Sequence, residues 1–198
     1  MCIPNQRINN LIERVNDRNI IQMRKLCVGI AKYMILSDMF ENKKINDGFM
    51  NLFLDFYVMK FHKDKLNRDE MQTLLQEGNA NNTPEDVMAR IRTDNTNMFS
   101  YATKVLHTID TSRPIYDSRV AVFFDLGNRK DNLTYKILRD RYTNNAESLG
   151  ALATSYEEII GSDICRNMIS YGNDDFTPEQ ALKISEVKKI DFVIWAFG

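Results

Sequence analysis

Apolar residues recur at helical spacing along almost the whole chain, and this periodicity limits the fold more than any other feature. A first helical face, at positions i, i+3, i+4 and i+7, comprises Ile8, Leu11, Ile12 and Val15. A second, longer segment continues the spacing through Ile20, Met23, Cys27, Ile30 and Met34. No segment alternates apolar and polar residues convincingly, as a half-buried strand would. The sequence therefore predicts an all-α protein.

Capping residues mark where several of these helices begin. Residues 83–86 (Thr-Pro-Glu-Asp) offer an N-cap, a proline in the first turn and two acidic side chains. Residues 177–180 (Thr-Pro-Glu-Gln) repeat the pattern with glutamine at the third helical position, which is a capping box. These signals predict about eight to eleven short helices joined by brief polar turns.

The length of the chain favours one compact unit. Its 198 residues, 43% of them hydrophobic, suffice for a substantial core. We expect a single all-α domain over residues 1–198 with two intimately packed helical lobes. A central lobe would span about residues 45–110, and both termini together with residues 113–198 would form the second.

Charge and cysteine content narrow the classes of function. The formal net charge of -1 provides no global attraction to nucleic acid or to an anionic membrane, although it allows a local basic face. The three cysteines (Cys2, Cys27 and Cys165) lie far apart without a CxxC pair. They predict free thiols rather than a disulfide framework or a metal centre, with Cys27 buried on an apolar helical stripe.

Targeting signals are not visible in the sequence. The N-terminal residues lack a basic region followed by an apolar core, and no apolar run is long enough to span a bilayer. The sequence predicts a cytoplasmic protein without membrane contact, and no cofactor or metal is expected.

Candidate chemistry is confined to residues 101–120. Lys104 falls within one predicted helix, and Asp117 falls at the start of the next, after a turn that contains Pro114. An amine and a carboxylate held at neighbouring helix ends can attack and stabilise an electrophilic carbon. Each residue also has an ordinary interpretation, since most helical lysines are solvated and most aspartates at helix starts are only caps.

Two segments here resemble the helix–hairpin–helix DNA glycosylase superfamily, especially its 8-oxoguanine glycosylase-like branch. They are residues 102–105 (Ala-Thr-Lys-Val) and residues 114–120 (Pro-Ile-Tyr-Asp-Ser-Arg-Val). The C-terminal residues 190–198 also resemble the terminal helix of small bacterial members. Outside these segments the likeness is a general helical pattern.

The resemblance implies a base-excision enzyme that acts on duplex DNA with a damaged base such as 8-oxoguanine. Lys104 would match the catalytic lysine, which attacks the sugar and gives the enzyme a lyase step, and Asp117 would match the catalytic aspartate. The damaged base would be flipped into a pocket between aromatic side chains.

Further residues near this pair are candidates for substrate binding. Tyr101, Tyr116 and Phe99 are expected either to stack on a base or to pack in the core. His107 follows Lys104 by one turn and would line the same pocket or lie in the core. Arg119 belongs to a basic group after the pair that would contact phosphates or form an ordinary solvated surface.

One departure from the family keeps a second function open. The family's hairpin is usually rich in glycine, whereas residues 97–102 (Asn-Met-Phe-Ser-Tyr-Ala) contain none. Glycines there would let backbone amides approach a phosphate closely. Their absence and the near-neutral charge favour a non-catalytic module of the same fold that binds proteins or nucleic acid. The lysine–aspartate pair favours the glycosylase.

Overall fold

The computed structural model describes residues 5–59, 65–94, 97–127, 129–163, 165–167 and 177–198. Within these ranges the chain is helical, and the one described β pairing is an isolated bridge between Leu66 and Arg92. The all-α prediction is confirmed.

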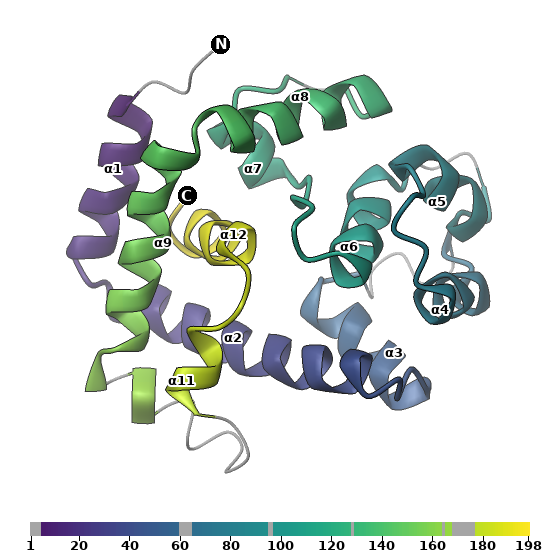
Figure 1. Ribbon diagram of the computed structural model, residues 1–198, viewed down its shortest axis with the longest axis horizontal. Helices are drawn as coiled ribbons and strands as arrows, with labels where there is room; N and C mark the ends of the chain where they lie inside the picture. Colours follow the sequence, from purple (N-terminus) through teal and green to yellow (C-terminus); the bar gives the residue numbers. More distant parts are fainter. Residues whose placement is uncertain (1–4, 60–64, 95–96, 128, 164, 168–176) are drawn as a thin grey trace.

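The helices follow one another with short connections (Figure 1). Their bounds are α1 (Asn5–Asn16), α2 (Ile20–Glu41), α3 (Asp47–Phe56), α4 (Arg68–Glu77), α5 (Pro84–Ile91), α6 (Phe99–Ile109), α7 (Ser118–Phe123), α8 (Asn132–Asn144), α9 (Ala146–Ile160), α11 (Pro178–Ala181) and α12 (Glu186–Phe197). The predicted starts at Thr83 and Thr177 are both capping boxes, so these two local predictions are confirmed.

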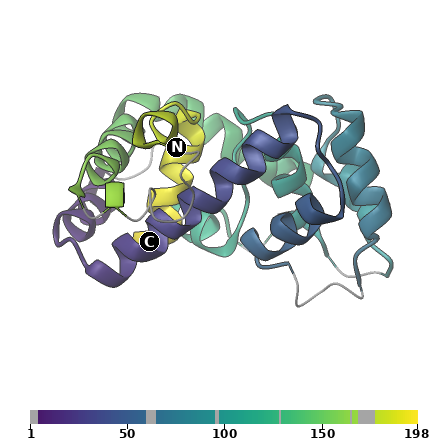
Figure 2. The ribbon, with the colours of Figure 1, turned by 90° about the horizontal axis from the view of Figure 1, so that it is seen from below.

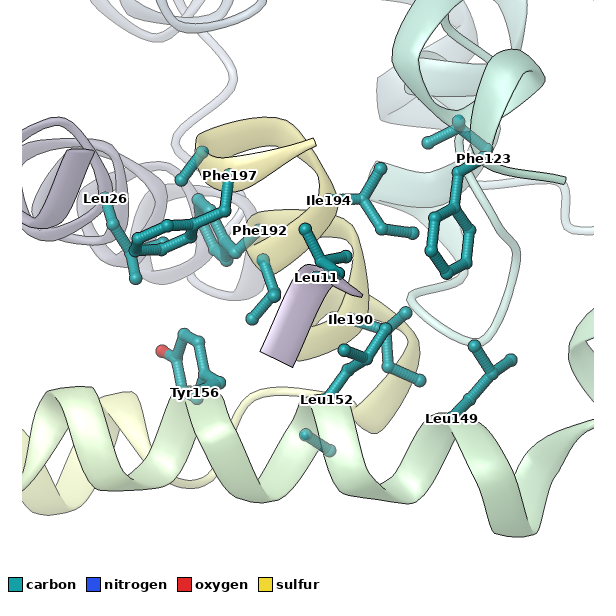
Figure 3. Close-up of a cluster of buried hydrophobic side chains, with 14 of the residues drawn as sticks. Leu11, Leu26, Phe123, Leu149, Leu152, Tyr156, Ile190, Phe192, Ile194 and Phe197 are labelled. Carbon is teal, nitrogen blue, oxygen red and sulfur yellow. The ribbon is translucent and has the colours of Figure 1, made fainter. Parts of the chain in front are cut away.

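A first hydrophobic core surrounds α12. The helix lies among α1, α2, α7 and α9, and apolar side chains from all of them converge on it (Figures 1 and 3). Leu11, Leu26 and Leu152 reach it from three different helices, while Phe192 and Phe197 belong to α12 itself. Burial of apolar area on this scale is the main stabilising contribution to such a bundle.

A second core joins α3, α4, α5 and α6 with the end of α2. In Figure 2, which views the molecule from below, α2 crosses in front of both groups of helices, and its residues contribute to each core. Phe56 and Met88 pack against both clusters. The two cores therefore adjoin instead of being separated by a linker.

Gly29 allows α2 and α12 to approach closely. A Cβ atom at this position would lie 3.2 Å from Cζ3 of Trp195 and 3.5 Å from Cε1 of Phe192. A side chain would therefore have to push the indole ring away. Gly29 therefore helps to set the positions of Trp195 and Phe192 on α12.

Three basic side chains cap the C-terminal end of α12. The Arg14 guanidinium donates to the carbonyl oxygen of Phe197 at 3.1 Å, and the Lys25 ammonium donates to that of Trp195 at 3.1 Å. Arg119 donates to the carbonyls of Trp195 and Gly198 at 2.6 and 3.1 Å. The last carbonyls of a helix have no intrahelical donor and carry partial negative charge, so cations from α1, α2 and α7 stabilise this end.

The expectation of free thiols is wrong for two of the three cysteines. Cys27 on α2 forms a disulfide with Cys165, whose Cα atom lies 5.7 Å away, and Cys2 lies outside the described residues. Cys27 is buried as predicted, but the pairing spans 138 positions, so sequence spacing gave no sign of it. Disulfides are rare in reduced cytosolic proteins, and the bond removes the cysteine argument for a cytoplasmic location.

No helix in the described part of the chain is long and apolar enough to cross a membrane.

We expect the disulfide to contribute measurably to stability, because it closes a loop of more than a hundred residues in the unfolded chain. A Cys27→Ala/Cys165→Ala variant should lose about 2–4 kcal/mol of unfolding free energy. Urea titrations with and without reductant would measure it. Reductant should lower the urea midpoint of the wild type and leave that of the variant unchanged. An equal midpoint of the wild type with and without reductant would contradict the prediction.

Candidate active site

Lys104 lies in the middle of α6 on the side that faces a cavity. The apolar face of the helix, which includes Ala102, Val105 and Leu106, packs into the second core. This packing sets the rotation of α6 and leaves Lys104 only partly exposed. Its ammonium donates to the carbonyl oxygen of Tyr57 at 3.2 Å, which ties the end of the side chain to the residue that follows α3.

Asp117 is the N-cap of α7. Its Oδ1 accepts a hydrogen bond from the backbone amide of Val120 at 2.8 Å. The extended segment before it is fastened to α6, because the amide of Tyr116 donates to Oγ1 of Thr103 at 3.1 Å. Thr103 directly precedes Lys104, so this bond brings the aspartate and the lysine to the same region.

Lys104 and Asp117 line one cavity of about 380 Å³. Its wall is built from the end of α3 and the residues after it, from α6, from the segment leading into α7, and from α12. The lining residues are Phe56, Tyr57, Val58, Ser100, Tyr101, Lys104, Ile115, Asp117, Ser118, Arg119, Lys130, Lys188, Asp191, Phe192 and Trp195. The volume falls within the range of about 300–1,000 Å³ typical of small-molecule sites.

A second lysine–aspartate pair lies in the α12 wall of this cavity, and the sequence analysis missed it. The Lys188 ammonium is 2.8 Å from Oδ2 of Asp191, and both side chains are buried. They stand three positions apart on a helix that is otherwise largely apolar toward its C-terminal end. Two charged residues within such an apolar pattern are the signal that would have indicated a functional role.

The surroundings of Lys104 and Asp117 shift both pKa values toward the neutral forms of the two side chains. Burial lowers the pKa of Lys104 below its ordinary value, against the opposing attraction of Asp117 and Asp191. Burial also raises the pKa of Asp117, and Asp191 adds to this effect. Hydrogen bonding from the Val120 amide and the charge of Lys104 act in the opposite direction.

The predicted aromatic residues separate into one that lines the cavity and two that do not. Tyr101 lines it, with the Lys104 ammonium 5.4 Å from the ring centre. Phe99 is fully buried and packs edge-on against Tyr116, with ring centres 5.2 Å apart. Tyr116 borders a neighbouring hollow of about 520 Å³ that shares Asp117 with the main cavity. Phe99 and Tyr116 therefore pack in the core beside the site and do not line the main cavity.

His107 lies in the core and not on the cavity wall. The side chain is fully buried, and its Nδ1 is 2.6 Å from the carbonyl oxygen of Arg113. A carbonyl can only accept, so Nδ1 carries the proton. Burial lowers the pKa of His107 to about 3, with a further contribution from the positive charge of Lys188. Of the two expectations for His107, lining the pocket or lying in the core, the structure shows the second.

Arg119 lines the cavity, but its guanidinium is engaged with α12. Its two bonds to the carbonyls of Trp195 and Gly198 make it a tether between α7 and α12. Among the other basic residues of this region, Arg113 pairs with Asp110 and Arg129 pairs with Asp131. Lys130 lines the cavity and is exposed.

Val58 stands at the rim of the cavity in an unusual backbone conformation. Its φ angle is +56°, and its side chain is 55% exposed. A positive φ is a rare outlier for a β-branched residue and costs about 1–3 kcal/mol. Such strain tends to occur at functional sites, and here an apolar side chain is held next to the cavity opening.

The described residues contain no group of three or more His, Cys, Asp or Glu side chains that could hold a metal ion.

Comparison with protein-family models, with curated proteins and with solved structures finds no match for this chain.

We expect His107 to destabilise the fold in acid. Its pKa is about 3 in the folded state and near 6.5 when unfolded, so the unfolded chain binds the extra proton as the pH falls from 6.5 toward 3. Stability should fall over that window by up to about 1.4 kcal/mol per pH unit from this residue. His107→Asn, which retains an N–H donor for Arg113, should flatten the slope. Urea unfolding at several pH values would measure it, and equal slopes in both proteins would refute it.

Proposed function

We propose that this protein is a DNA glycosylase that removes a damaged base such as 8-oxoguanine from duplex DNA, with Lys104 and Asp117 as its catalytic residues. The observation that carries the proposal is that both side chains line one cavity of suitable size. Lys104 and Asp117 belong to the two segments that most resemble the helix–hairpin–helix superfamily, and both line this cavity.

The state of Lys104 supports a nucleophilic role. An amine attacks carbon only through its free electron pair, so the protonated form is unreactive. Desolvation in the cavity shifts Lys104 toward the neutral form, as required of a lysine that forms a Schiff base. A lysine on an open helix surface would lack this property.

The placement of Asp117 supports stabilisation of a cationic sugar. As breakage of the glycosidic bond begins, positive charge develops at C1′ of the deoxyribose. A carboxylate fixed at a helix start by the Val120 amide can face that charge without reorganising. As an N-cap, Asp117 is held at the start of α7 by backbone amides while it lines the cavity.

The cavity lining suits a flipped base. Tyr57, Tyr101 and Trp195 present aromatic surface to the space, and Lys104 and Asp117 stand beside it. Enzymes that act on a base extrude it from the duplex and hold it by stacking against such side chains. Ser118 and Lys130, exposed at the same cavity, would contact the flanking phosphates.

The proposed reaction joins Lys104 to the sugar and releases the base. The neutral Lys104 nitrogen forms a bond to C1′ while the C1′–N bond breaks; the electrons of that bond leave with the base, which takes up one proton from the attacking amine. Cleavage of the C1′–O4′ bond then opens the sugar ring, O4′ takes up the second amine proton, and an imine remains between C1′ and Lys104. Water hydrolyses the imine, or loss of a C2′ proton expels the 3′ phosphate as the lyase step.

The alternative is a non-catalytic nucleic-acid or protein-binding module of the same fold. Residues 97–102, which correspond to the family's hairpin, support this alternative: they contain no glycine, and the Asn97 side chain accepts a hydrogen bond from the Phe99 amide at the start of α6. A module of this kind would bind DNA with a strong salt dependence, or bind a protein, and release no base.

Borohydride trapping on duplex DNA that contains 8-oxoguanine tests the nucleophile. Wild-type protein should form a covalent adduct, and Lys104→Gln should lose it completely because the attacking amine is absent. Lys183→Gln, which changes an exposed lysine outside the cavity, is the matched control and should retain the adduct. No adduct and no base release across a panel of damaged bases would reject the proposed glycosylase activity and favour the binding module.

Asp117→Asn separates catalysis from capping. Asparagine caps a helix as well as aspartate does, so the unfolding free energy should change by only a few tenths of a kcal/mol. The charge that stabilises the sugar cation is lost, and single-turnover base release should fall by about a hundredfold or more. Equal rates for both proteins would remove Asp117 from the mechanism.

A further inference from the structure

Lys188 is a buried cation whose presence the fold alone does not explain. Its residue is 1% exposed, and its ammonium lies near the faces of four aromatic rings. The distances to the ring centres are 4.7 Å for Phe192, 5.0 Å for Tyr33, 5.3 Å for Phe56 and 5.4 Å for Tyr57. These rings and the Asp191 carboxylate stabilise its positive charge.

A buried ion pair of this kind is a weak device for stability. Removing two charges from water costs several kcal/mol per ion, and apolar residues of similar volume are often as stable or more stable. Asp191 also has a buried oxygen, Oδ1, without a hydrogen-bond partner among the described residues. The pair therefore requires an explanation beyond packing.

Lys188 and Lys104 share one neighbour, the Tyr57 ring. The Lys104 ammonium lies 5.7 Å from the centre of this ring, and the Lys188 ammonium lies 5.4 Å from it. Both lysines line the same cavity, together with Asp191. The charges of Lys188 and Asp191 therefore both act on the pKa of Lys104.

We propose that Lys188 is a positioning residue for Lys104: its ammonium neutralises Asp191, so that no uncompensated carboxylate in the α12 wall holds Lys104 in its charged form. This inference builds on the proposed function, in which Lys104 must act as a free amine. It assigns the α12 pair to the control of that amine.

The charges that face Lys104 come from three parts of the fold. Asp117, at the start of α7, and Asp191, on α12, both favour the protonated amine, whereas Lys188 disfavours it. Arg119 and Lys130 line the same cavity, and Tyr57 and Tyr101 face the ammonium with their rings. Lys188 is the cation that is directly paired with one of the two carboxylates.

Loss of Lys188 would leave two unpaired carboxylates near Lys104. The pKa of Lys104 would rise, and the amine would be protonated over a wider pH range. An unpaired Asp191 would also raise the pKa of Asp117, which it already does to some extent. One substitution would therefore disable both members of the proposed catalytic pair without touching either.

The test measures the reactivity of Lys104 directly, in the absence of DNA. Acetic anhydride acetylates only neutral amines, so trace labelling between pH 6 and 11, read by peptide mass spectrometry, gives a titration midpoint for Lys104. The plateau at high pH reports access of the reagent to the amine. A merely structural role for Lys188 would change the plateau and leave the midpoint in place.

Two single variants should shift the titration midpoint of Lys104 in opposite directions, and the double variant should restore it. Lys188→Met should raise the midpoint of Lys104 and slow its labelling about three- to tenfold at pH 8, where half to one pKa unit corresponds to that factor. Asp191→Asn should lower the midpoint, because Lys188 then acts unopposed. The double variant Lys188→Met/Asp191→Asn should return the midpoint toward that of the wild type.

Lys189→Met is the matched control. Lys189 is the next residue on α12, is also buried and is also ion-paired, but its partner is Glu157 on α9 and it does not line the cavity. It should leave the Lys104 midpoint unchanged. If Lys188→Met does not fold, Asp191→Asn still tests the sign.

The outcomes separate this inference from the proposed function. An unchanged midpoint in Lys188→Met, or a midpoint that Asp191→Asn fails to lower, would overturn the role of Lys188 whatever the protein does to DNA. The expected shifts in a protein that releases no base would retain the role of Lys188 and reject the glycosylase.

Discussion

Helix α12 is buried at the centre of the first core, and its burial organises the helices around it. Helices α1, α2, α7 and α9 pack around it, and their apolar side chains converge on its surface (Figure 3). Its final carbonyls would be orphaned without the donors Arg14, Lys25 and Arg119, which come from three different helices. The same helix carries Lys188 and Asp191 to the cavity, so the forces that hold the core together also set one wall of the site.

The site brings two lysine–aspartate pairs to one cavity: Lys188 and Asp191 are buried in its wall, and Lys104 and Asp117 are partly exposed. Burial disfavours every isolated charge, and the pairing of Lys188 with Asp191 satisfies one cation and one anion. Lys104 and Asp117 are left with shifted pKa values of opposite sense, lowered for the amine and raised for the carboxyl. Groups moved toward their neutral forms in this way are typical of sites where protons and electron pairs are transferred.

Local patterns predicted what depends on neighbouring residues. Helical periodicity indicated the all-α class, and the capping boxes at Thr83 and Thr177 are present because a cap needs only residues within one turn. Asp117 was expected at a helix start for the same reason. Contacts between distant segments were not predictable: the Cys27–Cys165 bond and the Lys188–Asp191 pair beside Lys104 join parts of the chain whose separation no spacing rule relates.

Periodicity and capping residues were enough to predict the helical class, several helix starts and the turn between Lys104 and Asp117, since these follow from backbone preferences within one or two turns. Which side chains face the cavity could not be predicted, because it depends on how the helices pack. Tyr101 lines it while Phe99, two residues earlier on the same helix, is buried in the core, because the packing of α6 sets its rotation. The Lys104 side chain becomes buried only when α3, α6 and α12 are brought together, and this burial is what lowers its pKa.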